Sequence, residues 1–215
     1  MKTYQVEAGD TLSAIALREY GDATLYPVIA RQNHLANPDV IEIGQELLIP
    51  YVTLRHHFTT ADTTAARKKL TLHYYGTEDT QVQLIWEIVN GVAQREIQPG
   101  AWLLIPDVAN VGHHTVVGQE TLATLADSWF GDPDLAGLIG LVNQIPSGDD
   151  VVPGQVLIVP RLNRRARVAG DTLESLCVAE YGDFDVATRV AVAAAANHLE
   201  EPNSLHSNQV VFFPS

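Results

Sequence analysis

The chain has 215 residues, of which 46% are hydrophobic and 18% charged, a composition typical of soluble globular modules. Its net charge of -13 argues against nucleic acid or an anionic membrane surface as the main partner, because both attract a basic face. No apolar run approaches the ~18 residues of a membrane span, and the single cysteine, Cys177, excludes an intrachain disulfide framework.

The chain opens with an alternating strand at residues 4–6 and a turn at residues 8–10. Asp10 and Thr11 mark a helix start, because their side chains can accept hydrogen bonds from the amides of the first turn. The apolar stripe of this helix consists of Leu12, Ile15, Ala16 and Tyr20. Gly21 follows, and glycine tolerates the left-handed conformation that ends a helix.

A second helix carries Leu25, Val28 and Ile29 and ends near Asn33, where asparagine can also adopt the left-handed conformation. After a turn at residues 37–39, the string Gly-Gln-Glu-Leu-Leu-Ile-Pro at residues 44–50 predicts a closing strand. Its final proline cannot extend the strand ladder. The first 50 residues therefore predict a module of strand, helix, helix, strand.

The closing string returns in altered form at residues 100–106, 154–160 and 208–214. Such an internal repeat predicts four tandem βααβ modules of α+β class, at residues 3–50, 54–106, 112–160 and 164–214. The linkers have 3, 5 and 3 residues. At ~3.5 Å per residue they are short enough that neighbouring modules should touch and form a compact array.

The apolar stripe of the first helix is kept to different degrees in the later copies. It consists of Leu122, Leu125, Ala126 and Phe130 in the third copy and of Leu173, Leu176, Cys177 and Tyr181 in the fourth. The second copy keeps Leu70 and Tyr75 but places Arg67 and Thr71 at the other two positions. We therefore expect the second module to be degenerate.

The recurring residues, Tyr-x-Val, Gly-Asp-Thr-Leu-x-x-Ile-Ala, a late asparagine and Gly-Gln-x-Leu-x-Ile-Pro, resemble the LysM domain. This resemblance implies two helices on one face of a two-stranded antiparallel sheet. It also implies binding of N-acetylglucosamine polymers such as peptidoglycan or chitin.

Resemblance to LysM places a sugar groove between the first strand–helix turn and the turn before the closing strand. Here these turns are residues 8–12 with 33–39, 118–122 with 143–148, and 169–173 with 197–203. The candidate residues for glycan or partner contact are Gly9, Asp10, Thr11, Asn33, Glu120, Thr121, Asn143, Gly170, Asp171, Thr172 and Asn197. The alternative is that these residues are caps and turns that the fold needs in any case.

A variant of the motif suggests another role. The Tyr-Gly-Asp string at residues 20–22 and the Asn-Pro-Asp turn at residues 37–39 resemble the LysM variant of tail protein X in contractile-tailed phages and of LysM-bearing baseplate proteins in extracellular contractile injection systems. That resemblance implies an adaptor joining a spike or tube hub to the surrounding baseplate, in several symmetric copies. Because the first module begins at about Thr3 with no preceding secretory signal, we expect cytoplasmic synthesis and assembly into a virion-like or extracellular particle.

Two functions compete on these grounds. The leading prediction is a non-enzymatic baseplate adaptor with no cofactor, favoured by the short linkers and the lack of a signal segment. The alternative is a peptidoglycan-binding protein at the cell wall, favoured by the intact Gly-Asp-Thr-Leu turns at residues 9–12 and 170–173. Neither function calls for nucleic acid or a membrane as partner.

Histidines, the cysteine, tryptophans and arginines are the other residues that could form a site. We expect no metal site at the pairs His56-His57 and His113-His114, because neighbours on a strand point to opposite faces. No catalytic set is predicted, since Cys177 lies on a helix stripe as a buried thiol. The tryptophans Trp86, Trp102 and Trp129 are assigned to core or interface and not to sugar stacking. Four arginines form a candidate docking stripe for an acidic neighbour: Arg161, Arg164, Arg165 and Arg167. The alternative is that they belong to an exposed linker.

Overall fold

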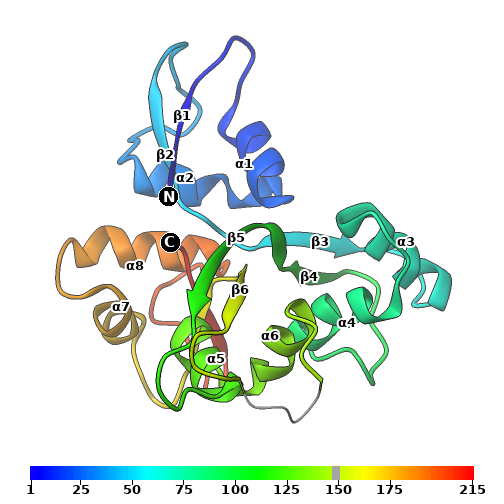
Figure 1. Cartoon of the computed structure of the whole chain (residues 1–215). Coiled ribbons are helices and arrows are strands. Elements are labelled where there is room, and N and C mark those ends of the chain that lie inside the picture. The colour runs from blue at the N-terminus through cyan, green and yellow to red at the C-terminus, as the bar shows by residue number, and fades with distance from the viewer. Residues whose placement is uncertain (147–150) are drawn as a thin grey trace. The chain divides into compact units, whose positions relative to one another are not determined.

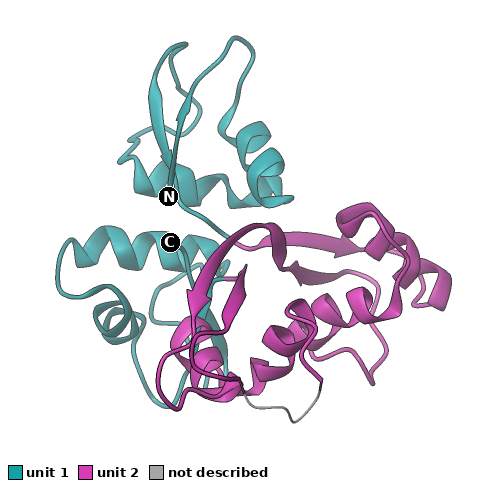
Figure 2. Cartoon of the chain, in the orientation of Figure 1, with its two compact units in different colours: residues 1–52, 163–215 teal, residues 53–162 magenta. Residues whose placement is uncertain are grey.

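The computed structural model describes residues 1–146 and 151–215, and these residues form an α+β fold, which confirms the predicted class. The chain divides into two compact units (Figure 2). Unit 1 consists of residues 1–52 and 163–215, and unit 2 of residues 53–162. Among the described residues, no helix is both long and apolar enough to cross a membrane.

Strand, helix, helix, strand order recurs in four successive segments of the described chain (Figure 1). The first segment contains β1 (Lys2–Gln5), α1 (Leu12–Tyr20), the short 3-10 helix η1 (Ala23–Leu25), α2 (Tyr26–Gln32) and β2 (Glu46–Ile49). The second contains β3 (Leu54–Phe58), α3 (Thr64–Tyr75), α4 (Thr80–Val89) and β4 (Ala101–Ile105). The third contains β5 (Asp107–Thr115), α5 (Leu122–Phe130), η2 (Pro133–Leu135), α6 (Ala136–Val142) and β6 (Val156–Arg161). The fourth contains β7 (Arg164–Arg167), α7 (Leu173–Tyr181), α8 (Val186–Ala196) and β8 (Val210–Phe213).

Each segment closes its own two-stranded antiparallel sheet, and the described strands form no sheet larger than that. In the first segment Gln5 pairs with Glu46 and Lys2 with Ile49. Since a two-stranded sheet with two helices buries little apolar surface by itself, such a segment gains stability from packing against another.

In unit 1 the hydrophobic core of the first segment extends into helix α8 of the fourth, which also has a core of its own. Helix α2 lies beside α8 (Figure 1), and Val192 and Ala196 of α8 belong to the same buried cluster as Val28 and Ile29 of α2. The last residue of the chain also bonds to the residue after Pro50, because the amide of Ser215 donates to the carbonyl of Tyr51 at 3.1 Å. Short linkers predict contacts between neighbours in sequence, whereas this pairing joins the first and last segments of the chain.

In unit 2 the second and third segments pack through α4 and α6. The two helices meet at Gly137 of α6 and Ile88 of α4, where a Cβ added at Gly137 would make an ordinary van der Waals contact of 3.7 Å with Cδ1 of Ile88. These two segments are neighbours in sequence, and only Pro106 separates β4 from β5, because the predicted linker at residues 107–111 is part of β5. Their contact agrees with this short connection.

The helix ends follow the sequence signals closely. The side chains of Thr11, Thr63, Thr121 and Thr172 cap the first helices of the four segments. Gly21, Gly76 and Gly131 end these helices in the left-handed conformation, whereas Gly182 has φ 80° with an extended ψ of -174°.

The late asparagines differ from their predicted conformation. Asn33 has φ -98°, and the left-handed residue is the next one, His34, with φ 52°. The same shift places Gln144 and His198 in the left-handed region. The physical reason is that the asparagine side chain is needed to bridge two elements, as described below.

The predicted apolar stripe is fully buried only in the first segment, where it consists of Leu12, Ile15, Ala16 and Tyr20. In the third segment Leu122 is half-buried, so its predicted core position is wrong, while Leu125, Ala126 and Phe130 are buried. In the fourth, Leu176 and Tyr181 are half-buried beside buried Leu173 and Cys177.

Candidate functional site

The late asparagine of each segment joins the end of the second helix to the closing strand. The amide of Asn33 donates to the carbonyls of Ile29 and Leu48, both at 2.8 Å. Its Oδ1 accepts from the amide of Leu48, also at 2.8 Å. The side chain of Asn33 thus makes three hydrogen bonds within the fold.

The same three bonds recur at the equivalent asparagines. Asn143 bonds to Ile139 and Ile158, and Asn197 bonds to Ala193 and Phe212, at 2.6 to 3.0 Å. Asn90 makes the corresponding bonds in the second segment. Of the predicted site residues, Asn33, Asn143 and Asn197 therefore hold the scaffold, and their side-chain amides are already engaged.

The aromatic residue before each helix-ending glycine ties the first helix to the closing proline. The hydroxyl of Tyr20 donates to the carbonyl of Pro50 at 3.0 Å, and that of Tyr75 to Pro106 at 3.0 Å. Tyr181 donates to Pro214 at 2.5 Å. Burial raises the pKa of Tyr20 and Tyr181 well above the ordinary value, so both hydroxyls stay protonated donors.

The strand–helix turn of the first segment is built around Asp10. Its Oδ2 accepts from the hydroxyl of Tyr4 at 2.6 Å and from the amide of Glu7 at 2.8 Å. These two hydrogen bonds, the Tyr4 bond first, hold the pKa of Asp10 below its usual value. Gly9 has φ 89°, a conformation that glycine adopts without strain, and Thr11 caps α1 by accepting from Ala14 at 3.1 Å.

The second turn of this segment precedes β2. Oδ1 of Asn37 accepts from the amide of Asp39 at 3.0 Å, which fixes an Asx turn. Two apolar side chains near this turn face solvent, since Val40 is 60% and Ile43 is 74% exposed. The side chains of Asp10, Thr11, Asn33 and Asn37 are engaged within the fold, so these residues offer a ligand their backbone groups, beside the exposed side chains of Val40 and Ile43.

The third and fourth segments repeat the first turn with other residues. Glu120 accepts from Nε2 of His114 and from the amide of Val117, both at 2.8 Å, and the His114 bond is the main cause of its lowered pKa. Asp171 accepts from the amide of Ala169 at 3.0 Å. Gly170 has φ 95°, and Thr121 and Thr172 each form a capping box. Part of the predicted 143–148 turn, residues 147 and 148, lies outside the described residues.

In the second segment an ion-pair cluster joins the corresponding turns. Arg67 pairs with Asp62 at 2.6 Å and with Glu87 at 2.7 Å. Its guanidinium also donates to the carbonyls of Val92 at 3.0 Å and Arg95 at 2.7 Å. The sequence marked Arg67 as a break in an apolar stripe, and that break was the one signal of this cluster, because a half-buried guanidinium needs partners.

The adjacent histidines and the tryptophans contact other side chains of their own segments. His56 lies 3.1 Å from the hydroxyl of Tyr74 through Nδ1, while His57 stacks on Trp102 with ring centroids 4.6 Å apart. Trp86 is in the core and donates to Thr71 at 3.1 Å. Trp102 is 40% exposed, so of the two predicted places, core or interface, only an interface remains for it. Trp129 is half-buried and makes an edge contact with His114.

The candidate arginine stripe is divided between the two units, and its three members in unit 1 do not lie on one face. Arg161 ends β6 in unit 2, whereas Arg164, Arg165 and Arg167 lie on β7 in unit 1, where successive side chains point to opposite faces. Arg164 pairs with Glu180 at 2.9 Å, and Arg167 donates to the carbonyl of Asn208 at 3.2 Å. At least two of the four are thus engaged within their own segment.

The lone thiol is buried in the core of the fourth segment. Cys177 is 1% exposed, and burial raises its pKa to about 11. At neutral pH the group is therefore a protonated thiol, as the helix stripe predicted. The described residues hold no cluster of three or more histidine, cysteine or acidic side chains suited to a metal ion.

Comparison with known proteins identifies a LysM domain at residues 4–50. These residues contain nearly all of the first segment, with both of its turns. The potassium binding protein Kbp of Escherichia coli is 51% identical over 49 residues, which cover 22% of this chain and 33% of Kbp. A solved structure, the spore cortex-lytic enzyme SleL of Bacillus megaterium, is 28% identical, with a TM-score of 0.24, over 51% of this chain and 23% of that one.

A longer match concerns proteins named as enzymes. Esterase Rv1288 of Mycobacterium tuberculosis is 39% identical over 160 residues, which cover 74% of this chain and 33% of the esterase. The chain thus spans about a third of the length of the curated relatives that match it over most of its residues. This finding contradicts the prediction of a non-enzymatic protein. The prediction of a non-enzymatic protein used only the residues of the repeat. Those residues do not show that the matching relatives are esterases.

Proposed function

We propose that the chain binds peptidoglycan, or a related polymer of N-acetylglucosamine, through residues 8–12 and 33–39 of its LysM domain. The observation that carries this proposal is the domain match at residues 4–50, which contains both turns. The geometry supports it, because several polar side chains at these turns hold the turns in shape and leave backbone groups and exposed Val40 and Ile43 for a ligand. An apolar side chain beside backbone donors and acceptors suits the mixed surface of an N-acetylated sugar.

We extend the proposal to the other three copies and rank them by how well their turns suit a glycan. The segments at residues 54–106, 112–160 and 164–214 are proposed to be LysM-like modules, because they repeat the element order, the asparagine bridge and the threonine cap. The fourth keeps Gly170, Asp171 and Thr172 and is the best second glycan site. The second is the least suited, since Arg67 and its partners tie its two turns together.

The match to the esterases supports a second proposal, on what glycan binding is for. An esterase that covers 74% of the chain at 39% identity supports a role for these segments in bringing esterase action to a glycan-rich surface. Hydrolysis of p-nitrophenyl acetate by the purified chain, alone and on sacculi, tests whether the chain itself carries that activity. A rate equal to that of buffer in both samples would limit the role of the chain to binding.

The baseplate adaptor receives no support from the relatives found and serves here as the competing outcome. It predicts poor retention on sacculi and loss of particle assembly when the gene is deleted. The glycan proposal predicts retention on sacculi that depends on the turns of the LysM domain.

Sedimentation with peptidoglycan sacculi separates these outcomes. We expect the protein to pellet with sacculi and Ile43→Asp to weaken retention several-fold, because it puts a charge where an apolar contact is proposed. Leu17→Asp is the matched control, since Leu17 is 56% exposed on α1 outside the turns. Equal retention of the two variants, or no retention of the parent protein, would contradict the proposal.

A further inference from the structure

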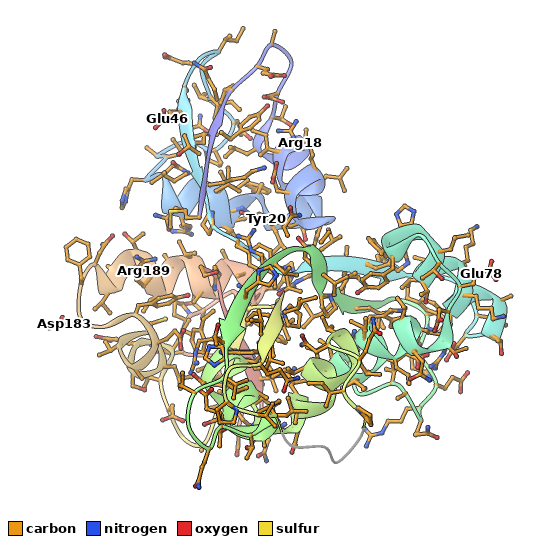
Figure 3. All side chains as sticks on the ribbon, in the orientation of Figure 1. Arg18, Tyr20, Glu46, Glu78, Asp183 and Arg189 are labelled. Carbon is orange, nitrogen blue, oxygen red and sulfur yellow. The ribbon has the colours of Figure 1, made fainter. Side chains whose placement is uncertain are left out.

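The turn between α7 and α8 exposes an aromatic side chain. Phe184 is 81% exposed, more than any other large hydrophobic residue in the described part of the chain. It stands between Asp183 and Asp185, which are also exposed, and Figure 3 shows Asp183 at the outer edge of the fourth segment. Aromatic side chains are common anchors of protein interfaces, because burying the ring removes a large apolar surface from water.

The turn that carries Phe184 differs from the same turn in the other segments. There Asp22 and Asp132 cap the 3-10 helices η1 and η2, and Asp79 caps α4. In the fourth segment α8 follows α7 with no 3-10 helix, and Asp185 precedes α8 with φ 52° and no side-chain cap bond. The turn thus gives up a stabilising cap where it exposes Phe184, and such local costs are typical of functional surfaces.

A pocket of complementary character opens beside β3 and α3 of the second segment. Its volume is about 540 Å³, and buried Phe58 and Leu70 are among its walls. The lining includes most of the strand–helix turn at residues 59–63 but no carboxylate. The acidic side chain of that turn, Asp62, does not line the pocket and is paired with Arg67 at 2.6 Å.

The charge of the pocket comes from Lys69. The pKa of His56 is lowered, first by burial and then by His73 and His57, so the His56 ring tends to stay neutral. Lys69 is exposed and carries a fixed positive charge at the pocket. In a protein with 26 acidic and 13 basic residues, an apolar pocket with an ammonium and no carboxylate favours an acidic partner that carries an apolar group.

We propose that Phe184 of one copy of the chain inserts into this pocket of a second copy, with Asp183 and Asp185 beside Lys69. The apolar walls suit the ring, and the ammonium suits the two carboxylates. Since two different surfaces meet, the contact is heterologous and links copies head to tail, into a ring or an open chain. A single turn in a pocket covers far less than the ~1,200 Å² of a stable complex, so we expect weak association. This inference does not depend on glycan binding.

Sedimentation velocity of the full chain, from micromolar to near-millimolar concentration, tests the contact. The mean sedimentation coefficient should rise with concentration, and Phe184→Ser and Lys69→Glu should each abolish the rise. Leu17→Ser and Lys68→Glu are the matched controls, because Leu17 is 56% exposed on α1 and Lys68 does not line the pocket. A parent protein that stays monomeric, or controls that behave like the test variants, would overturn the inference.

Mixing the two test variants examines the head-to-tail arrangement. Phe184→Ser keeps the pocket and Lys69→Glu keeps the exposed ring, so one-to-one dimers should form in the mixture although neither variant associates alone. A mixture that remains monomeric would show that the ring and the pocket are not partners.

A synthetic peptide with the sequence of residues 182–186, Gly-Asp-Phe-Asp-Val, gives a second measurement. It should shift the NMR resonances of the pocket residues in the parent protein and bind Lys69→Glu at least about tenfold more weakly. The same peptide with serine in place of phenylalanine should lose binding by a similar factor. Equal affinity for the two peptides would contradict insertion of the ring.

Discussion

At the scale of single residues, the late asparagine shows why a sequence pattern can be recognised before its purpose is known. Its recurrence marked the end of each second helix, and a left-handed cap was the natural prediction. Asn33 adopts a different conformation because its amide bonds to both Ile29 and Leu48. These partners come from the end of a helix and from the closing strand, and no local pattern reveals that their polar groups will meet.

The asparagine bridge predicts a large effect of a small change. Asn33→Ala removes three hydrogen bonds, two of them to the backbone of Leu48, while the carbonyl of Ile29 keeps the backbone amide of residue 33, so we expect a loss of about 2–3 kcal/mol in the free energy of unfolding. Asn37→Ala, which removes one bond in an exposed turn, should cost about 1 kcal/mol or less. Urea unfolding measures both variants, and equal losses would argue against the bridge.

Asp10 predicts a dependence of stability on pH. Its pKa is lowered in the folded state by bonds from Tyr4 and Glu7. A lowered carboxyl pKa means that the unfolded chain binds protons first, so the stability is present above about pH 4 and is lost as pH falls through the folded pKa. Thermal melts from pH 6 to pH 2 should therefore show a shallower decline for Asp10→Asn than for the parent protein. An unchanged slope would show that this turn does not couple to proton binding.

At the scale of elements, the strands, helices and caps of the first segment follow from local patterns, because threonine caps, glycine ends and apolar spacing act within a few residues. The second segment departs from them. Arg67 occupies a stripe position, and its partners Asp62, Glu87 and two loop carbonyls come from three separate stretches. In the sequence, such a cluster of distant residues is visible only as an arginine at a position where the helix stripe expects an apolar residue.

The Arg67 cluster predicts severe destabilisation when one member is removed. The side chains of Asp62 and Glu87 are 7% and 5% exposed, so Arg67→Ala would leave two nearly buried carboxylates unpaired. We expect a loss of about 3–5 kcal/mol. Arg95→Ala serves as control, because it retains the carbonyl that Arg67 contacts and changes an exposed side chain. Similar melting temperatures for the two variants would contradict the cluster's structural role.

At the scale of the whole molecule, the segments are grouped in a way that the repeat did not predict. The repeat spacing and linkers describe neighbours along the chain, whereas the core of the first segment extends to Val192 and Ala196 of the last. In Figure 3, Tyr20 lies at the end of α1 and Glu46 on β2 of the first segment, while Arg189 lies on α8 of the fourth. A repeat pattern cannot rank which copies pair, because every copy presents a similar second helix.

This extended core predicts that damage to one segment reaches the other. Val192→Asp places a charge at a 3% exposed position of α8, and we expect faster amide hydrogen exchange in α2 as well as in α8. Ala187→Asp changes an exposed position of the same helix and should leave α2 protected. Loss of protection confined to α8 would show that the two segments are stable independently.

Function is the part that the sequence predicted least well. The resemblance to LysM was right for residues 4–50, but the preference for a baseplate adaptor rested on the Tyr-Gly-Asp string, the short linkers and the expected lack of a signal segment. The structure gives that string a role within the fold, since the Tyr20 hydroxyl bonds to Pro50. A motif explained by folding carries little information about partners, so the glycan alternative becomes the stronger proposal.

The measurement that tests this account most directly is an NMR titration of the full chain with an N-acetylglucosamine oligomer. The account predicts amide shift changes concentrated in residues 8–12 and 33–39, followed by residues 169–173 and 197–203. Amides in these turns should respond because the ligand would contact their backbone groups, while α1 and β2 should change little. Saturating oligomer without shifts in either pair of turns, or with shifts confined to the arginines of β7, would contradict it.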